Sequence, residues 1–397
     1  MKNKLAISIG VIVLLIVGIY LFNYNKKETI TFNNNVDTNR IAIYLVDKNG
    51  NETLSSSNEF PNEGYIYNSE KSSCENGTYL EWNDRDKSIT LVGDTKDTCK
   101  VYFDVYAPTF ADDIIALSST NSHIYHHDSS LTNGAKDDSY RYAGPNSTVN
   151  DNYVCFGYNR ESYNNECESG TFSATSDYAY RIIGVFKDVD GNSNDAYYVK
   201  LIKATSYGSY HWDNESSTSS NYSNDFSVST LFSTTLNGAN SSYLATLNSN
   251  GWSNYLAQPK WYVGGNTFAN IYSKQASVAY TNERTDTNTV NTSYKIGLMY
   301  PSDYGFATSN SYWTTALSSY NSAAAAQDWL YVSGLGVEWT ISRTSDTTNG
   351  AFRVNSAGIV DNQSVWYSYV VRPVLYLSSN VKAIGSGTIE SPYILSM

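Results

Sequence analysis

Three segments near the C-terminal end decide the expected fold: IGLMYPSDYG at 296–305, WTISR at 339–343 and VRPVLYL at 371–377. Aromatic residues, glycines and a few charges alternate there with short runs that suit β-strands. This pattern is typical of a loop-rich domain that presents a ligand, and it differs from that of a helical bundle or a doubly wound sheet. We take these segments as the centre of a C-terminal domain spanning residues 138–397.

The rest of this domain carries signals for both strands and helices. The runs YRIIGVF at 180–186 and YYVKLIK at 197–203 flank a turn-forming loop, which predicts a β-hairpin. Residues 226–247 contain spaced leucines and few β-branched residues, which predicts one or two short helices. The predicted fold class is therefore α+β.

A smaller module precedes this domain. Residues 28–107 contain short alternating runs separated by turn signals, which predict an all-β module of about five strands. Residues 108–137 are polar and hold three of the four histidines, and we expect a linker there. The expected organisation is a membrane segment at 1–27, the β module, the linker and the C-terminal domain.

The composition favours an extracellular binding surface and argues against nucleic acid as a partner. Tyrosine supplies 36 of the 397 residues, only 16% of the chain is charged, and the net charge is −12. A surface rich in Tyr, Ser, Asn and Gly gives adaptable hydrogen bonding, although a genome of low GC content would produce the same bias. The acidic balance disfavours binding to polyanions.

A hydrophobic segment lies close to the N-terminus. Leu5–Phe22 contains 18 residues without a charge, which is just long enough to span a bilayer. The residues that follow make a poor cleavage site, so we predict an uncleaved signal-anchor, a single-pass membrane protein and an extracellular C-terminal domain. A cleaved signal peptide is the alternative.

The chain has four cysteines, Cys74, Cys99, Cys155 and Cys167, which allow three pairings. The sequential pairing, Cys74–Cys99 and Cys155–Cys167, keeps each bond within one predicted domain. No C-x-x-C spacing suggests a metal site. We predict two disulfides, each contributing about 3 kcal/mol to stability.

Two segments raise the question of metal binding. His123, His126 and His127 could supply imidazole ligands, but no further ligand is evident, and the adjacent pair is expected to point apart. The acidic loop 188–195 resembles a calcium loop, but its glycine stands at the fourth position and no acidic residue follows at the twelfth. We predict no metal and no cofactor, while both segments stay open.

The segments at 180–186, 296–305, 339–343 and 371–377 together resemble an uncharacterised family of Gram-positive surface proteins. That family has a W-x-x-S segment, an A-x-x-V-x-x-x-G hairpin and a terminal V-R-P strand, matched here at 339–342, 351–358 and 371–373. The order of elements is also similar to that in the formylglycine-generating, or sulfatase-modifying-factor, branch of the C-type-lectin-like fold. The resemblance covers about residues 138–397. It implies a mixed α+β domain with long loops and a ligand surface near the tryptophans.

The resemblance does not imply that this chain shares a catalytic activity with those proteins. The oxidase members of that branch use a cysteine pair to hold copper, whereas Cys155 and Cys167 both precede residue 180. The sequence also lacks the G-x-S-x-G and H-E-x-x-H motifs. The expected function is a membrane-anchored binding or adhesion protein without catalysis, whose ligand is a glycan or a protein. The alternatives are an enzyme of the sulfatase-modifying type and a purely structural envelope protein.

Flat aromatic faces and a few directed polar groups suit a specific ligand pocket. The candidate ligand-binding residues are Tyr300, Asp303, Tyr304, Trp313, Trp339 and Arg343. The competing interpretation of the tryptophans is a core that is short of leucine and methionine. Arg372 lies within a β run and must be paired if it is buried; Asp303 or Glu338 could pair with it, so we expect a structural role.

Overall fold

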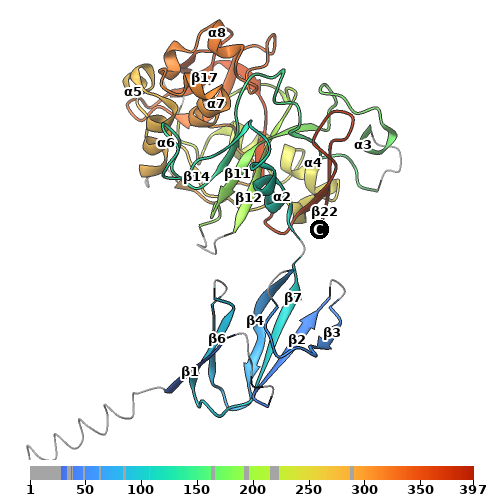
Figure 1. Ribbon diagram of the computed structural model, residues 1–397. Coiled ribbons are helices and arrows are strands. Elements are labelled where there is room, and N and C mark those ends of the chain that lie inside the picture. Colours follow the sequence, from blue (N-terminus) through green and yellow to red (C-terminus); the bar gives the residue numbers. More distant parts are fainter. Residues whose placement is uncertain are drawn as a thin grey trace, which may run out of the picture. The chain divides into compact units, whose positions relative to one another are not determined.

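The computed structural model describes residues 28–397 apart from 34–36, 38, 48–49, 62–63, 84–85, 107, 162–165, 192–195, 215–222 and 287–289. The chain forms two compact units, Met1–Ala107 and Pro108–Met397. Figure 1 shows the elements of both units.

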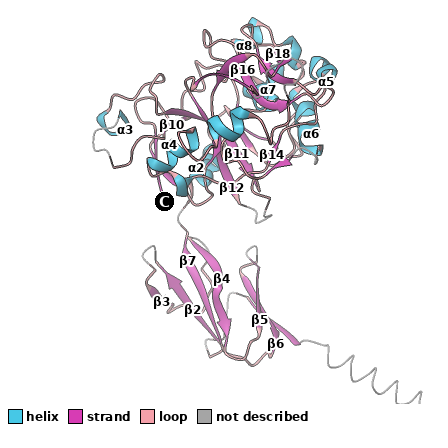
Figure 2. Ribbon diagram, turned by 180° about the vertical axis from the view of Figure 1, so that it is seen from behind, coloured by secondary structure: helices cyan, strands magenta, loops and turns pink. Residues whose placement is uncertain are grey.

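Strands dominate both units, so the prediction of an α+β fold was wrong. In Figure 2 the strands are magenta, and the cyan helices are short. The longest helix among the described residues has 10 residues, and none of the described helices is long and apolar enough to cross a membrane. The predicted membrane segment, Leu5–Phe22, lies outside the described residues.

The N-terminal unit consists of two β-sheets with seven described strands, whereas the sequence predicted about five. One sheet has the order β1-β6-β5 and the other β3-β2-β7-β4. The strands are β1 (Glu28–Phe32), β2 (Ile41–Val46), β3 (Glu52–Leu54), β4 (Tyr65–Cys74), β5 (Tyr79–Asn83), β6 (Ser88–Gly93) and β7 (Cys99–Val105). Side chains that alternate along β2, β6 and β7 form the core, among them Ile41, Ile43, Leu91, Val101 and Phe103.

The C-terminal unit is organised around a sheet in which eight described strands take part. Its main path is β20-β12-β11-β10-β22-β21, and β9 joins both β8 and β11. The strands are β8 (Ile124–His126), β9 (Tyr140–Tyr142), β10 (Tyr153–Cys155), β11 (Ala179–Lys187), β12 (Tyr197–Lys203), β20 (Val374–Tyr376), β21 (Lys382–Ile384) and β22 (Tyr393–Ser396). β11 and β12 pair antiparallel, so the predicted hairpin is present.

A second sheet in this unit carries one of the segments on which the sequence prediction was centred, WTISR at 339–343, as β16. VRPVLYL at 371–377 contains β20 of the large sheet, and IGLMYPSDYG at 296–305 leads into the helix α7 (Pro301–Ala307). Its order is β13-β19-β16-β17-β18. The strands are β13 (Gly208–His211), β16 (Glu338–Arg343), β17 (Gly350–Val354), β18 (Val360–Ser364) and β19 (Ser368–Val371), and a separate pair consists of β14 (Trp261–Tyr262) and β15 (Val290–Asn291).

Short helices connect these strands. They are α2 (Phe110–Leu117), α3 (Glu166–Ser169), α4 (Tyr243–Ser249), α5 (Phe268–Ser273), α6 (Ala276–Thr285), α7 (Pro301–Ala307) and α8 (Ser322–Ala325). The region predicted to be helical, 226–247, contains a π-helical turn at Leu231–Leu236 and most of α4. Leucine spacing therefore located the helices but overstated their share of the fold.

Residues 108–137 belong to the C-terminal unit, so they do not form the predicted linker. Thr109 and Asp112 form a capping box at the start of α2, which satisfies backbone N–H groups at that end. Phe110 and Ile114 on α2 are fully buried in the core of the unit. β8 then pairs with β9, which places the histidine segment at the edge of the large sheet.

Both predicted disulfides are present. Cys74–Cys99 joins the ends of the paired strands β4 and β7. Cys155–Cys167 joins β10 to α3. No cysteine of the chain is free.

Candidate functional site

Most of the predicted ligand-binding residues lie in the hydrophobic core. Tyr300, Asp303, Tyr304, Trp313 and Trp339 are each no more than 3% exposed. They therefore do not surround an open cleft, and the structure does not support a ligand surface made of these side chains. The core uses large aromatic side chains where leucine or methionine is scarce, and six tryptophans are almost completely buried.

The polar atoms of these aromatic side chains are satisfied inside the protein. The indole N–H of Trp313 donates to the carbonyl of Thr308 at 3.1 Å, and that of Trp339 donates to the carbonyl of Tyr210 at 3.1 Å. The hydroxyl of Tyr304 donates to the carbonyl of Gly358 at 2.8 Å. A buried Trp or Tyr with such a partner connects segments of the core.

Arg343 is the predicted ligand residue that reaches a surface hollow. Its side chain is half-buried and lines a polar hollow of about 340 Å³ together with Asp225 and Asn291. Its Nε atom is buried and has no hydrogen-bond partner among the described residues. Among the described residues that line this hollow, Arg343 is the one with a buried polar side-chain atom that lacks a partner.

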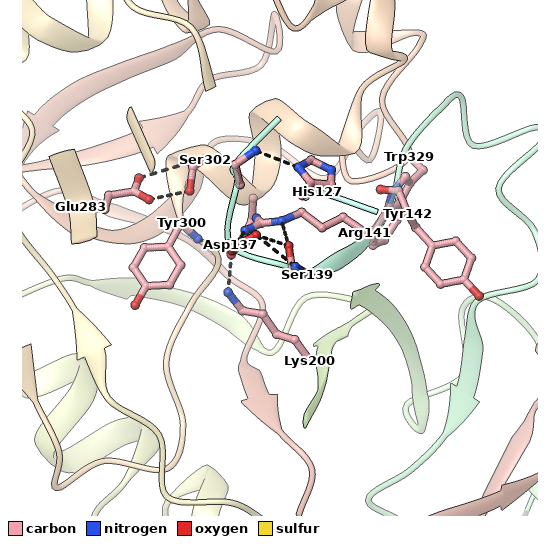
Figure 3. A network of polar contacts seen from close by, with 12 residues as sticks. His127, Asp137, Ser139, Arg141, Tyr142, Lys200, Glu283, Tyr300, Ser302 and Trp329 are labelled. Atoms are coloured by element: carbon pink, nitrogen blue, oxygen red, sulfur yellow. Dashed lines mark hydrogen bonds and ion pairs between the residues drawn. The ribbon is translucent and has the colours of Figure 1, made fainter. Parts of the chain in front are cut away.

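Arg141, Asp137 and Lys200 belong to a buried network of charges (Figure 3), and Asp303 lies between Lys200 and Arg141 in it. Its Oδ2 atom lies 2.5 Å from Nζ of Lys200, and its Oδ1 atom lies 3.6 Å from Nη1 of Arg141. Arg141 also pairs with Asp137 at 2.6 Å. The backbone N–H of Tyr300 donates to Asp303 at 2.9 Å as part of the cap of α7. The network thus fixes α7 to β9 and β12, and its burial excludes a ligand.

Two further titratable groups in this region are held neutral by burial. Burial raises the pKa of Glu283 to about 8, and Ser302 donates hydrogen bonds to its carboxyl group. Burial and the nearby charge of Arg141 hold the pKa of His127 well below its usual value. The Nδ1 atom of His127 accepts a hydrogen bond from the N–H of Ala135, so its proton is on Nε2.

The three histidines of the candidate metal segment at 123–127 do not converge with other described ligands on a site. His127 points into the core, whereas His126 hydrogen-bonds to Asp138 at 2.6 Å. Among the described residues, no group of three His, Cys, Asp or Glu side chains is placed to hold a metal ion. Part of the acidic loop at 188–195 lies outside the described residues.

Arg372 forms a two-point ion pair with Glu338. Its Nε and Nη2 atoms each lie 2.8 Å from a carboxylate oxygen, and Nη2 also donates to the carbonyl of Leu330 at 2.7 Å. Both side chains are buried. The pairing satisfies a charge that would otherwise be costly inside a strand region. It engages one side of the guanidinium and leaves Nη1 without an acceptor among the described residues.

Arg372 also lines a pocket with a volume of about 640 Å³. This volume lies in the usual range for sites of small ligands. Alanine and tyrosine side chains contribute much of its wall, and Arg181, Arg372 and Asp328 contribute the charged groups. The remaining lining residues are Asn146, Tyr153, Ala174, Thr175, Ala204, Ser322, Ala325, Ala326, Tyr331, Val332, Ser333, Ser356 and Ala357.

The charges of this pocket are unbalanced. Burial raises the pKa of Asp328 well above its usual value, although Arg372 and Arg181 oppose the shift. The Oδ2 atom of Asp328 is buried and has no partner among the described residues. Arg181 donates to the side-chain oxygens of Asn146 and Asn152 and to the backbone carbonyls of Val149 and Trp329, and no described carboxylate forms an ion pair with it. Because Glu338 neutralises Arg372, one positive charge remains.

Sequence reasoning missed Arg181 and Asp328. Arg181 stands inside the apolar run 180–186, just as Arg372 stands inside 371–377. A charge within a buried strand is rare and signals a partner or a site. Asp328 sits in a polar context that offered no comparable signal.

Comparisons with family models, with curated proteins and with solved structures found no match for this chain. The resemblance to Gram-positive surface proteins therefore stays a prediction.

Proposed function

We propose that the C-terminal unit is an extracellular binding module that holds a small carboxylate in the Arg372 pocket, without catalysis. The carrying observation is the polar lining of the pocket: no described carboxylate forms an ion pair with Arg181, and the buried Oδ2 atom of Asp328, whose pKa burial raises, has no partner among the described residues. A monoanionic ligand would balance the remaining charge. The two disulfides support an oxidising location outside the cell.

The pocket favours a carboxylate over a larger anion. A guanidinium presents its N–H donors in a planar fork that matches a carboxylate. In this pocket Glu338 takes one side of Arg372, so the free Nη1 atom would give a single directed contact. A phosphate carries more charge than the single unpaired arginine would balance.

The unpaired carboxyl oxygen of Asp328 indicates which second group the ligand would carry. A buried carboxyl group with an unpartnered oxygen is costly, and a ligand N–H or O–H group would relieve this cost. The ring of Tyr153 and the alanines offer an apolar wall for the body of the ligand. Amino acids, hydroxy acids and uronic acids combine these features: one carboxylate and a nearby donor.

The enzyme alternative has no such support. An oxidase of the sulfatase-modifying type needs a reactive cysteine pair, and both cysteines of this unit are joined in one disulfide between β10 and α3. They also line none of the pockets described above. We therefore do not extend the proposal to that chemistry.

Thermal unfolding of the full chain with small carboxylates tests the proposal. Amino acids, hydroxy acids and uronic acids are added, each beside its methyl ester. A ligand at about one hundred times its Kd stabilises the folded state by about 2.7 kcal/mol, which is readily seen as a higher Tm. We expect the acid of at least one pair to raise the Tm and its ester to leave it unchanged.

Two variants connect this shift to the pocket. Ala357 is exposed and lines the pocket, so Ala357→Trp should fill it and abolish the shift without disturbing the core. Ala116→Trp, on an exposed position of α2, is the matched control and should retain the shift. The proposal fails if no acid raises the Tm or if the shift survives in Ala357→Trp.

A further inference from the structure

A row of aromatic side chains lies at one edge of the five-stranded sheet. This aromatic strip consists of Tyr207, Tyr210, Trp366, Tyr367 and Tyr369, on β13 and β19 and next to them. Trp366 and Tyr367 are 44% and 47% exposed, and the other three are half-buried. Large aromatic side chains gathered at a surface mark an interaction site more often than scattered ones do.

The rings of the strip form two stacked pairs. Tyr207 and Tyr210 stack with centroids 5.7 Å apart and planes 28° apart, and Tyr367 and Tyr369 stack at 6.0 Å and 8°. Tyr210 is directly opposite Tyr369 in the ladder between β13 and β19, so the two stacks share one face of the sheet.

The backbone and the neighbouring side chains fix the orientation of these rings. Gly208 has a φ of +149°, and a Cβ atom there would lie 2.8 Å from the ring of Tyr210. The ring of Tyr210 thus lies directly against the glycine backbone. Tyr369 packs edge-on against Trp339 at 4.8 Å, and the guanidinium of Arg353 lies 4.8 Å from the centre of the Tyr369 ring. Preformed ring faces lose little entropy when a ligand binds.

Two hollows adjoin the stacked pair Tyr207–Tyr210. Tyr207 lines a hollow of about 340 Å³, and Tyr210 lines another of about 280 Å³. The second is lined by hydroxyl and amide groups, among them Asn214, Thr230 and Thr234, and by His211; its described lining residues include no Asp, Glu, Lys or Arg. Thr234 lies within the π-helical turn at Leu231–Leu236, a feature that often accompanies functional sites.

We propose that the aromatic strip and the hydroxyl-lined hollow beside it bind an extended, uncharged glycan. Pyranose rings have flat apolar faces that stack on tyrosine rings, while their hydroxyls exchange hydrogen bonds with Thr, Ser and Asn side chains. The exposed rings of Trp366, which lies 5.4 Å from the ring of His211, and of Tyr367, which stacks on Tyr369, would contact separate sugar units. The net charge of −12 disfavours an acidic polysaccharide.

A polypeptide ligand fits this surface less well. An extended peptide binds through main-chain hydrogen bonds to a sheet edge and through apolar pockets for alternate side chains. Here the hollow beside β13 is lined by hydroxyl groups rather than by apolar side chains. The site is separate from the carboxylate pocket, with no lining residue in common, so the two proposals stand independently.

Isothermal titration of the full chain with cellohexaose, maltohexaose and chitohexaose tests this proposal. We expect at least one hexasaccharide to bind, and its disaccharide to bind more weakly because it covers fewer rings. Removing one exposed ring should weaken binding about fivefold. The single variants Trp366→Ala and Tyr367→Ala are suitable because both side chains are exposed, so folding should be retained.

Tyr79→Ala, which removes a tyrosine that is 63% exposed in the N-terminal unit, is the control and should bind like the unchanged chain. Ala357→Trp should also leave hexasaccharide binding intact, which separates this site from the carboxylate pocket. Failure to bind any hexasaccharide would overturn the proposal. So would binding that neither strip variant weakens, or binding of an extended twelve-residue peptide in place of the sugars.

Discussion

Replacing Glu283 by glutamine should stabilise the C-terminal unit at neutral pH. Glu283 is 1% exposed, and burial raises the pKa of its carboxyl group to about 8. The folded protein therefore keeps this group protonated at neutral pH, whereas the unfolded chain releases the proton. Glutamine has nearly the same shape as the protonated acid and never ionises. Its amide oxygen can accept the backbone N–H of Ser302, as the carboxyl does now.

The sign and size of the effect follow from linkage. The folded pKa is raised above the unfolded value of 4.5, so the stability that Glu283 contributes is complete below about pH 4.5 and is lost as pH rises towards 8. Each pH unit in this window costs about 1.4 kcal/mol. Between pH 4.5 and pH 7 the loss amounts to about 3 kcal/mol, and Glu283→Gln should not show it.

Urea unfolding at a series of pH values between 4.5 and 7.5 measures this difference. Tryptophan fluorescence is a suitable signal, because Trp82 is the only one of the eight tryptophans that precedes Pro108. The free energy of unfolding of Glu283→Gln minus that of the unchanged chain should increase with pH. Other titrating groups are common to both proteins and largely cancel in the difference. Glu390→Gln, at an exposed position of the same unit, is the control and should show no such trend.

Two results would refute this reasoning. If the difference between Glu283→Gln and the unchanged chain stays constant with pH, Glu283 does not change its protonation on unfolding. If the glutamine variant is the less stable protein at pH 7.5, the buried group is an ionised carboxylate that Ser302 and its surroundings stabilise.

Two further predictions concern the core and the second disulfide. Trp313→Ala should lower the free energy of unfolding by about 3 to 5 kcal/mol in urea titrations, because the indole is 1% exposed; a loss below 1 kcal/mol would show that the ring is not a core element. Replacing Cys155 and Cys167 by serine should destabilise the C-terminal unit by about 3 kcal/mol. The unfolding of the N-terminal unit, which the fluorescence of Trp82 reports, should not change. Subtracting the signal of the same chain with Trp82→Phe isolates the contribution of Trp82.

The strands β11 and β12 were predictable because each is a short, largely apolar run beside a turn signal, and both are buried along almost their whole length. β11 and β12 appear within the predicted hairpin, with their ends displaced by a residue or less. The positions of the helices were predictable, but their small share of the fold was not. Residues 226–247 have helical spacing over windows too short to separate a two-turn helix from a π-helical turn. The α+β prediction counted these signals as though they were long helices.

The predicted start of the C-terminal domain at residue 138 was wrong, and the sequence itself contains a signal for an earlier start. The segment 108–137 is polar overall, and this property suggested a linker. It also has Phe110 and Ile114 four residues apart behind a capping box of Thr109 and Asp112, which is the signature of a short helix packed on a core. A local helix signal should therefore outweigh an average polarity.

The candidate site was harder to predict because aromatic residues suit both a core and a ligand surface. Tyr300 and Trp339 are buried, whereas Trp366 and Tyr367 are exposed, and no local pattern separates the two groups. The distinction depends on which segments pack together in three dimensions. The charged residues within apolar runs were more informative, since Arg181 is buried as the pattern requires.

Three buried arginines of the C-terminal unit, Arg141, Arg372 and Arg181, show how the same residue type can be paired within the fold in one place and lack a described ion-pair partner in another. Arg141 lies close to two carboxylates, Asp137 and Asp303, and aromatic rings cover its guanidinium, among them Phe306 at 5.0 Å. It borders none of the pockets described above. Arg372 has a single carboxylate partner and borders a pocket of about 640 Å³ in which a second arginine, Arg181, has no described ion-pair partner. A buried cation close to two carboxylates has its charge met within the fold, whereas an excess cation beside an open volume provides binding energy for an anion. This contrast, rather than the mere presence of buried charge, is the reason to test the Arg372 pocket first.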